Sequence, residues 1–302
     1  MPDLLLLLLP DFLLIVCGYL ICRHTPLDRP IWDGAEKLVY FVLFPVLLFT
    51  SIVRNPQRPG ELLPLAASGV AVVLLGVGLA YALRRWPGVD AHLHASGAQT
   101  AFRFNSYIAL ALSERLAGTQ GLAWIALIMS LCVPLCNVAA VWPLARHGGQ
   151  GYARELLRNP LILATAGGLL FNLLGLKLPE LAMNTATRIG SAALPLGLMA
   201  VGAGLRLGAL REGPGLAAAL LAIRHAVLPL AAIVLVVALG LPPAQQAVVV
   251  AFAAMPTASS AYVLAVRMGG HGSYVAGLIT VSTLIGMAGL PLALAALQAV
   301  SR

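Results

Sequence analysis

The stretch 251–266 is apolar at both ends and polar in the middle, where it reads Met-Pro-Thr-Ala-Ser-Ser. Pro256 has no N–H and its ring clashes with the carbonyl four residues earlier, so a helix here must kink or break. The side chains of Thr257, Ser259 and Ser260 can bond the backbone groups that the break releases, or a polar ligand. This pattern predicts non-covalent binding through hydroxyls and backbone amides.

A second apolar stretch, 101–112, is interrupted in the same way by Arg103, Asn105 and Ser106. Asn105 can both donate and accept hydrogen bonds. The guanidinium of Arg103 can contact a carboxylate, cap a half-helix or extend towards water. The sequence leaves these three roles open.

The composition places both stretches in a membrane. Hydrophobic residues make up 60% of the 302 residues and charged residues 10%, with a mean hydropathy of +0.92. A soluble domain carries about 25% charged residues. The net charge of +8 does not indicate nucleic-acid binding, because the basic residues are spread over short connections, as in membrane proteins.

The sequence predicts an all-α integral membrane protein with ten membrane spans, each about 20 apolar residues long. The predicted spans are 4–22, 36–53, 61–83, 97–116, 121–144, 159–176, 183–205, 217–240, 245–266 and 273–299. The two interruptions fall in the fourth and ninth spans. Such breaks are tolerated at membrane depth only where protein or a watery cavity covers them.

Matching breakers indicate an inverted repeat. Pro45 and Pro195 lie 150 residues apart (195 − 45) in the second and seventh spans, and Ser106 and Pro256 have the same offset (256 − 106). Five spans in each copy would place the second copy upside down, as in many secondary carriers. We therefore expect residues 1–145 to form one five-span repeat, 146–158 a cytoplasmic connection, and 159–302 the inverted copy.

Half-helices that begin at the two breaks would point unsatisfied N–H groups and a partial positive charge towards the middle of the membrane. Intramembrane polar groups are costly and tend to be functional. The candidate binding set also includes polar residues of other spans: Asn137, Thr50, Ser51 and Thr283. For Arg224 and His225 in the eighth span we expect a role as interfacial anchors, and for Gly202 helix packing or a subunit contact.

Acidic residues lie almost entirely outside the spans, so no mid-membrane carboxylate pair presents itself as a proton relay or sodium site. No phosphate-binding loop, metal-ligand spacing or catalytic constellation is found, which predicts a non-enzyme without cofactor or metal. The odd-numbered connections carry more Lys and Arg than the even-numbered ones, so we expect both termini outside.

Short motifs throughout the chain resemble the auxin efflux carrier family, bacterial branch, a fold similar to that of the bile-acid symporters. The motifs are Gly18-Tyr19, FPVLLFTSI at 44–52, FNSYIALAL at 104–112, VPLCNV at 133–138, NPLI at 159–162, LPLGLMAVGAGL at 194–205, MPTASSAYVLA at 255–265 and STLIGMAGLPL at 282–292. They follow the family's order over nearly the whole length.

The resemblance implies crossing broken helices in spans four and nine, a scaffold of spans one, two, six and seven, and a transport unit that moves like an elevator. It also implies a homodimer through spans two and seven. Asn105 and Pro256 match the two crossover signatures, and Asn137 matches the fifth-span polar site. The sequence departs from the family in two places: the third span lacks the plant carriers' acidic residue, and the fourth-span crossover lacks a proline.

We therefore expect a secondary-active or facilitative transporter of small organic anions, such as malate, malonate or auxin-like acids, in a bacterial inner membrane. Its partners would be the substrate, membrane lipids and a second copy of the chain. The alternative is a sodium-coupled symporter of the bile-acid type, which a sodium requirement for substrate binding would favour.

Overall fold

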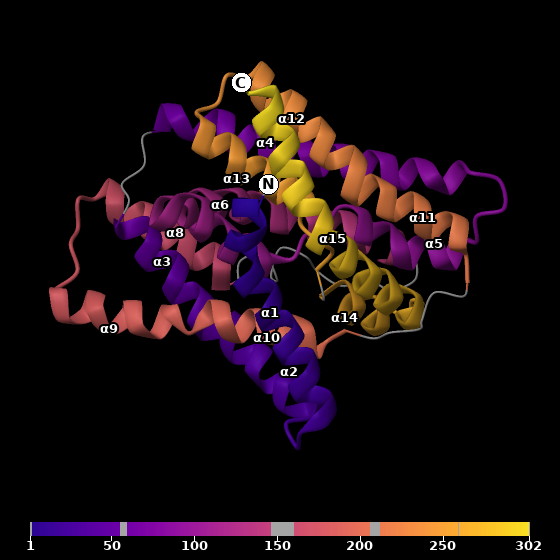
Figure 1. The fold of residues 1–302 in the computed structure, drawn as a ribbon, viewed down its shortest axis with the longest axis horizontal. Helices are drawn as coiled ribbons and strands as arrows, with labels where there is room; N and C mark the ends of the chain where they lie inside the picture. The colour runs from indigo at the N-terminus through magenta and orange to yellow at the C-terminus, as the bar shows by residue number, and fades with distance from the viewer. Residues whose placement is uncertain (1, 55–58, 146–159, 206–211, 259, 302) are drawn as a thin grey trace.

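The computed structural model describes residues 2–54, 59–145, 160–205, 212–258 and 260–301, and this part of the chain is helical without strands. Figure 1 shows the arrangement. The helices are α1 (Pro2–His24), α2 (Arg29–Leu38), α3 (Phe44–Arg54), α4 (Pro59–Ala82), α5 (Ala91–Gly97), α6 (Ser106–Ala145), α8 (Pro160–Leu173), α9 (Glu180–Ser191), α10 (Ala193–Ala203), α11 (Pro214–Ala222), α12 (Leu228–Ala238), α13 (Pro243–Ala254), α14 (Ser260–Arg267) and α15 (Gly272–Val300).

Short turns of other helical types continue several of these helices. The π-helical turn Val39–Leu43 joins α2 to α3, and the π-helical turn Ile223–Val227 joins α11 to α12. The 3₁₀ turns Leu83–Arg85 and Ala98–Ala101 extend α4 and α5. Each π-helical turn is followed closely by a proline, Pro45 or Pro229, which cannot donate the next backbone hydrogen bond.

Six helical segments among the described residues are long and apolar enough to cross a membrane. They are Arg29–Arg54, Leu62–Arg85, Ala91–Ala140, Glu180–Ala203, Pro214–Ala238 and Gly272–Val300. The segment Ala91–Ala140 contains a break and a kink, the kink lying at Ala117 and Gly118, where Gly118 has a φ of 58°. Three shorter apolar helical segments, Phe12–His24, Leu163–Leu173 and Pro243–Ala254, lie beside them.

The fourth predicted span starts earlier than the sequence suggested. We expected it to begin at 97, but α5 begins at Ala91 because Asp90 caps it. The Asp90 carboxylate accepts hydrogen bonds from the amides of His92 (2.9 Å) and Leu93 (2.8 Å). A carboxylate in this place satisfies amides that a helix start otherwise leaves unpaired.

One group of helices is built around close contact between α1 and α10. A Cβ added at Gly202 would lie 2.9 Å from the backbone nitrogen of Tyr19, and one at Gly18 would overlap the backbone of Met199. Small residues permit such approach between membrane helices. The packing expectation for Gly202 is therefore met within the chain, between α10 and α1. Nearby, α3 packs against α8 and α9.

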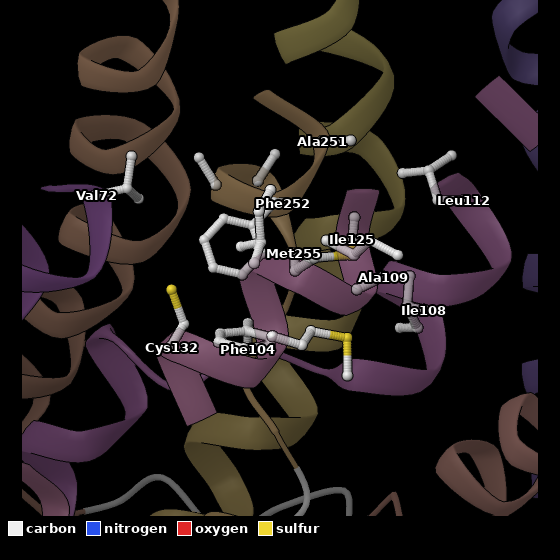
Figure 2. Close-up of a cluster of buried hydrophobic side chains, with 14 of the residues drawn as sticks. Val72, Phe104, Ile108, Ala109, Leu112, Ile125, Cys132, Ala251, Phe252 and Met255 are labelled. Carbon is white, nitrogen blue, oxygen red and sulfur yellow. The ribbon is translucent and has the colours of Figure 1, made fainter. Parts of the chain in front are cut away.

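The second group of helices surrounds α13. It packs against α6, α12, α15 and α4, and α14 packs against α15. The buried hydrophobic cluster at the centre of this group is shown in Figure 2, where Phe104, Phe252 and Met255 lie together. The rings of Phe104 and Phe252 make an edge-to-face pair with centroids 4.5 Å apart. This cluster lies beside the two interruptions.

Candidate functional site: two crossing helix breaks

The first break covers Phe102–Asn105. Helical structure stops after Ala101 and resumes at Ser106, without a proline. The side-chain oxygen of Asn105 accepts hydrogen bonds from the amides of Tyr107 (3.0 Å) and Ile108 (3.2 Å). Asn is a preferred residue at this position because its short side chain reaches the first free amides of a helix. Asn105 thus starts the second half-helix.

The second break follows α13. Met255 leaves the helical conformation with φ −58° and ψ 143°, and α14 begins at Ser260. Pro256 and Thr257 lie in the non-helical segment and are buried, whereas Ser260 is exposed. Ser259 lies outside the described residues.

The two breaks lie against each other and are hydrogen-bonded, and we call this contact the crossing. The amide of Asn105 donates to the carbonyl of Pro256 at 2.8 Å. The hydroxyl of Thr257 donates to the carbonyl of Thr100 at 2.7 Å, and the amide nitrogen of the Gln99 side chain donates to the carbonyl of Ala261 at 3.1 Å. These bonds satisfy backbone groups that a break at membrane depth would leave unpaired.

Arg103 lies at the crossing with neutral partners only. Its Nη2 donates to Oδ1 of Asn137 at 2.8 Å and makes a longer bond to the hydroxyl of Ser260 at 3.4 Å. Its Nη1 is 3.4 Å from Oε1 of Gln99. Among the described residues no carboxylate pairs with it, and its side chain is partly exposed. A guanidinium with spare donors at this place can bind an anion.

Arg224 lies elsewhere than we expected. It is only 2% exposed, and it donates from Nε to the carbonyl of Met255 (2.5 Å) and from Nη2 to that of Phe252 (3.1 Å). The prediction of an interfacial anchor was therefore wrong. The physical reason is that α13 ends before Met255: the carbonyl of Phe252 has only a long backbone bond from the Met255 amide (3.4 Å), and Arg224 supplies further donors to both carbonyls.

His225, the next residue, is tied to the other side of the same break. Its Nε2 is 2.8 Å from the hydroxyl oxygen of Ser282, which accepts a hydrogen bond from the amide of Thr257 at 2.9 Å. Sequence reasoning named Ser282 among the polar residues that could widen the site, but it did not place Gln99 or Arg224 there. The sequence did contain one signal for Arg224. An ionisable residue within a membrane span is a candidate functional residue by default, and Arg224 is such a residue.

Three of the candidate residues use their hydroxyls within their own helices. Thr50 donates to the carbonyl of Val46 (2.9 Å), Ser51 to that of Leu47 (2.7 Å) and Thr283 to that of Ile279 (2.9 Å). All three are buried. They are not among the described hydrogen-bond partners of Arg103, whereas Asn137 and Ser260 are.

A model of a family described as membrane transport proteins matches residues 146–294, which include the second break. The chain belongs to this family. It is the family of the auxin efflux carriers, so the resemblance to that family is confirmed, while its bacterial branch stays a prediction. No curated protein sequence matches the chain. Together with the long apolar helices, membership of the membrane transport protein family identifies an integral membrane transporter.

Proposed function

We propose that the chain carries small organic anions across the membrane, by secondary-active or facilitative alternating access, with the substrate bound at the crossing of the two breaks. The observation that supports this most directly is the environment of Arg103. Its guanidinium is partly exposed and pairs with amide and hydroxyl groups but with no described carboxylate. An anion would complete its hydrogen bonds and balance its charge.

The starts of two half-helices add to this positive environment. The N-termini of α6, at Ser106, and α14, at Ser260, both lie at the crossing. Each N-terminus carries free amides and about half a unit of positive charge. We propose that Asn137, Ser260 and Thr257 help to orient the substrate and that Asn105 and Pro256 keep the two breaks in place. Small carboxylates such as malate, malonate or auxin-like acids suit such a site.

The packing supports a division of labour between the two groups of helices. We propose that α1, α3, α8 and α10 form the scaffold, because α1 and α10 approach each other at glycines and α3 packs on α8. The helices around α13 would then move as the transport unit, in an elevator-type exchange between inverted repeats 1–145 and 159–302. Cysteine cross-links between α3 and α6 should stop transport if the two groups move against each other.

A homodimer through spans two and seven is the proposed assembly, in a bacterial inner membrane with both termini outside. Large apolar side chains are exposed on these spans, including Phe41 (61%) on span two and Ile189 (40%) on span seven. The mass of the protein in lipid nanodiscs tests the dimer. Labelling of single cysteines near the termini in intact cells tests the orientation.

The binding site is tested by uptake of labelled carboxylates into proteoliposomes. Arg103→Ala should weaken transport by about 10–100-fold, the value of one or two hydrogen bonds to a charged group. Arg84→Ala, which removes an exposed cation at the end of α4, is the matched control and should transport like the parent protein.

A second variant separates charge from folding. Asn137→Asp would place a carboxylate where Oδ1 now lies 2.8 Å from Nη2 of Arg103. This carboxylate would pair with Arg103 and compete with the substrate, so transport should fall while the melting temperature holds or rises. Undiminished uptake by both Arg103→Ala and Asn137→Asp would show that the substrate binds elsewhere.

A further inference from the structure

Arg224 is a buried cation in a membrane-length helical segment, Pro214–Ala238. Its side chain is 2% exposed, and both of its hydrogen bonds to described residues end on backbone carbonyls. A charged side chain inside a membrane protein is costly unless it is fully partnered, and such residues usually serve function. The partners of this guanidinium therefore indicate what it does.

Those partners form the end of a half-helix. Phe252 lies in the last turn of α13, and Met255 is the first residue beyond it. The last carbonyls of a helix have no partner in the helix itself and carry about half a unit of negative charge. The guanidinium therefore faces a ready-made cation site composed of main-chain oxygens.

Among the described residues, no acidic side chain pairs with Arg224 in place of these carbonyls. The π-helical turn that contains Arg224 packs against α4, α11, α12, α13, α15 and the 3₁₀ turn Ala98–Ala101. In the sequence of these elements the one carboxylate is Glu61, in the first turn of α4. It lies 15 residues before Gly76 (76 − 61), whose added Cβ would meet Leu228, and 15 residues of helix span about 22 Å.

Carriers built from broken helices commonly hold their coupling cation on unwound carbonyls and half-helix C-terminal ends. We propose that Arg224 is a tethered cation that takes the place of a coupling sodium ion at the second break. The positive charge then stays with the protein throughout the transport cycle. If the chain carries anions as proposed above, it does so without requiring sodium.

The residue after Arg224 supports the same interpretation. While Arg224 holds the carbonyls before Pro256, His225 contacts Ser282, which holds the amide after Pro256. Two consecutive residues of one π-helical turn thus fix both sides of the break. π-Helical turns within α-helices are frequent at functional sites.

The test uses the thermal stability of the purified protein, which needs no knowledge of the substrate. The protein is melted in sodium chloride, choline chloride or a low concentration of guanidinium chloride at equal ionic strength. The parent protein should melt at the same temperature in sodium and choline. Arg224→Ala, which removes the donors and leaves space, should melt roughly 5–10 °C lower and recover part of the loss with guanidinium or sodium.

Three further variants make the result specific. Arg224→Met fills the space with an apolar chain, so it should melt lower without recovery in either cation. Arg224→Lys retains a charge and should be more stable than Arg224→Gln. This last comparison decides the question if Arg224→Ala does not fold.

Sodium-specific stabilisation of the parent protein would overturn the proposal, and so would an Arg224→Ala variant that is as stable as the parent. The proposal would also fail if neither cation restored the stability of Arg224→Ala and Arg224→Lys were no more stable than Arg224→Gln. Arg224 would then be a packing residue only. In proteoliposomes, the parent should transport equally in sodium and choline. A protein that transports no carboxylate would contradict the proposed function. The melting temperatures would still test the proposal for Arg224.

Discussion

The contact between α1 and α10 allows a sharp prediction about the stability of the scaffold. Gly202→Ala would place a methyl group 2.7 Å from the carbonyl carbon of Ile15 and 2.9 Å from the nitrogen of Tyr19, with the oxygen of Ile15 closer still. Ordinary contacts lie at 3.4–4 Å. The obstructing atoms are backbone atoms of a helix, so no side chain can rotate away.

The magnitude follows from the distance that the helices must separate. Relieving the contact with the Tyr19 nitrogen requires about 0.5 Å (3.4 − 2.9), and the contact with the carbonyl of Ile15 requires more. Overpacking of this kind costs ~1–3 kcal/mol. Replacing glycine by alanine within a helix stabilises the folded protein by up to ~1 kcal/mol, because alanine has the higher helix propensity. The net expectation is a destabilisation of ~1–2 kcal/mol.

A matched control isolates the packing effect. Gly78 lies within α4, and a Cβ there would meet no atom within 4 Å. Gly78→Ala has the same gain in helix propensity without the clash and should be neutral or slightly stabilising. Thermal unfolding of both variants in one detergent, followed by tryptophan fluorescence, measures the difference. Equal melting temperatures for Gly202→Ala and Gly78→Ala would refute the reasoning about close helix contact.

Three further predictions concern the breaks and the cap of α5. Asn105→Ala should destabilise the protein by ~1 kcal/mol because α6 loses its cap, whereas Asn105→Ser should retain most of the stability in the same melting assay. Phe104→Leu should cost ~0.5–1.5 kcal/mol through the lost ring pair with Phe252, and Phe104→Leu combined with Phe252→Leu should cost less than the sum of the two single changes. The backbone amides of Leu93 and His92 hold the pKa of Asp90 below its usual range. Because the folded pKa is depressed, this cap stabilises α5 above the unfolded pKa of about 4 and is lost as the pH falls through the folded value. The protection of the Leu93 amide against hydrogen exchange, relative to the intrinsic rate at each pH, should therefore fall in acid in the parent protein and change less with pH in Asp90→Asn.

The general character of the protein could be predicted from its sequence because the signals are local. Long apolar runs with few charges indicate membrane helices, and the ordered motifs identify the family. Two span starts were predicted too late, the second (36, where α2 begins at Arg29) and the fourth. Both lie where polar residues begin a helix; at the fourth, His92, His94 and Ser96 resemble a loop in sequence. The structure shows a short helix capped by Asp90 and tied to the rest of the site by hydrogen bonds, including that from the His271 amide to Ser96.

Arg224 shows why other features were not accessible from the sequence. Its position near the start of an apolar helix fits an interfacial anchor equally well, because long basic side chains reach water from such positions. The decision depends on whether unpaired carbonyls lie within reach, and those belong to α13, some 28–31 residues further along the chain. Pairing over such a distance requires the packing of α12 against α13, which no local pattern encodes.

The two arginines at the crossing share a residue type but not a role, and the difference follows from their acceptors. Arg224 meets the negative end of α13, so its charge is balanced within the protein. Arg103 lies beside the positive starts of α6 and α14 and meets only amide and hydroxyl oxygens among its described partners. A cation close to two positive helix ends is electrostatically unfavourable until an anion arrives. Under the proposed function, Arg224 is the fixed cation on the carbonyl side of the second break, and the anion would bind beside Arg103 on the amide side.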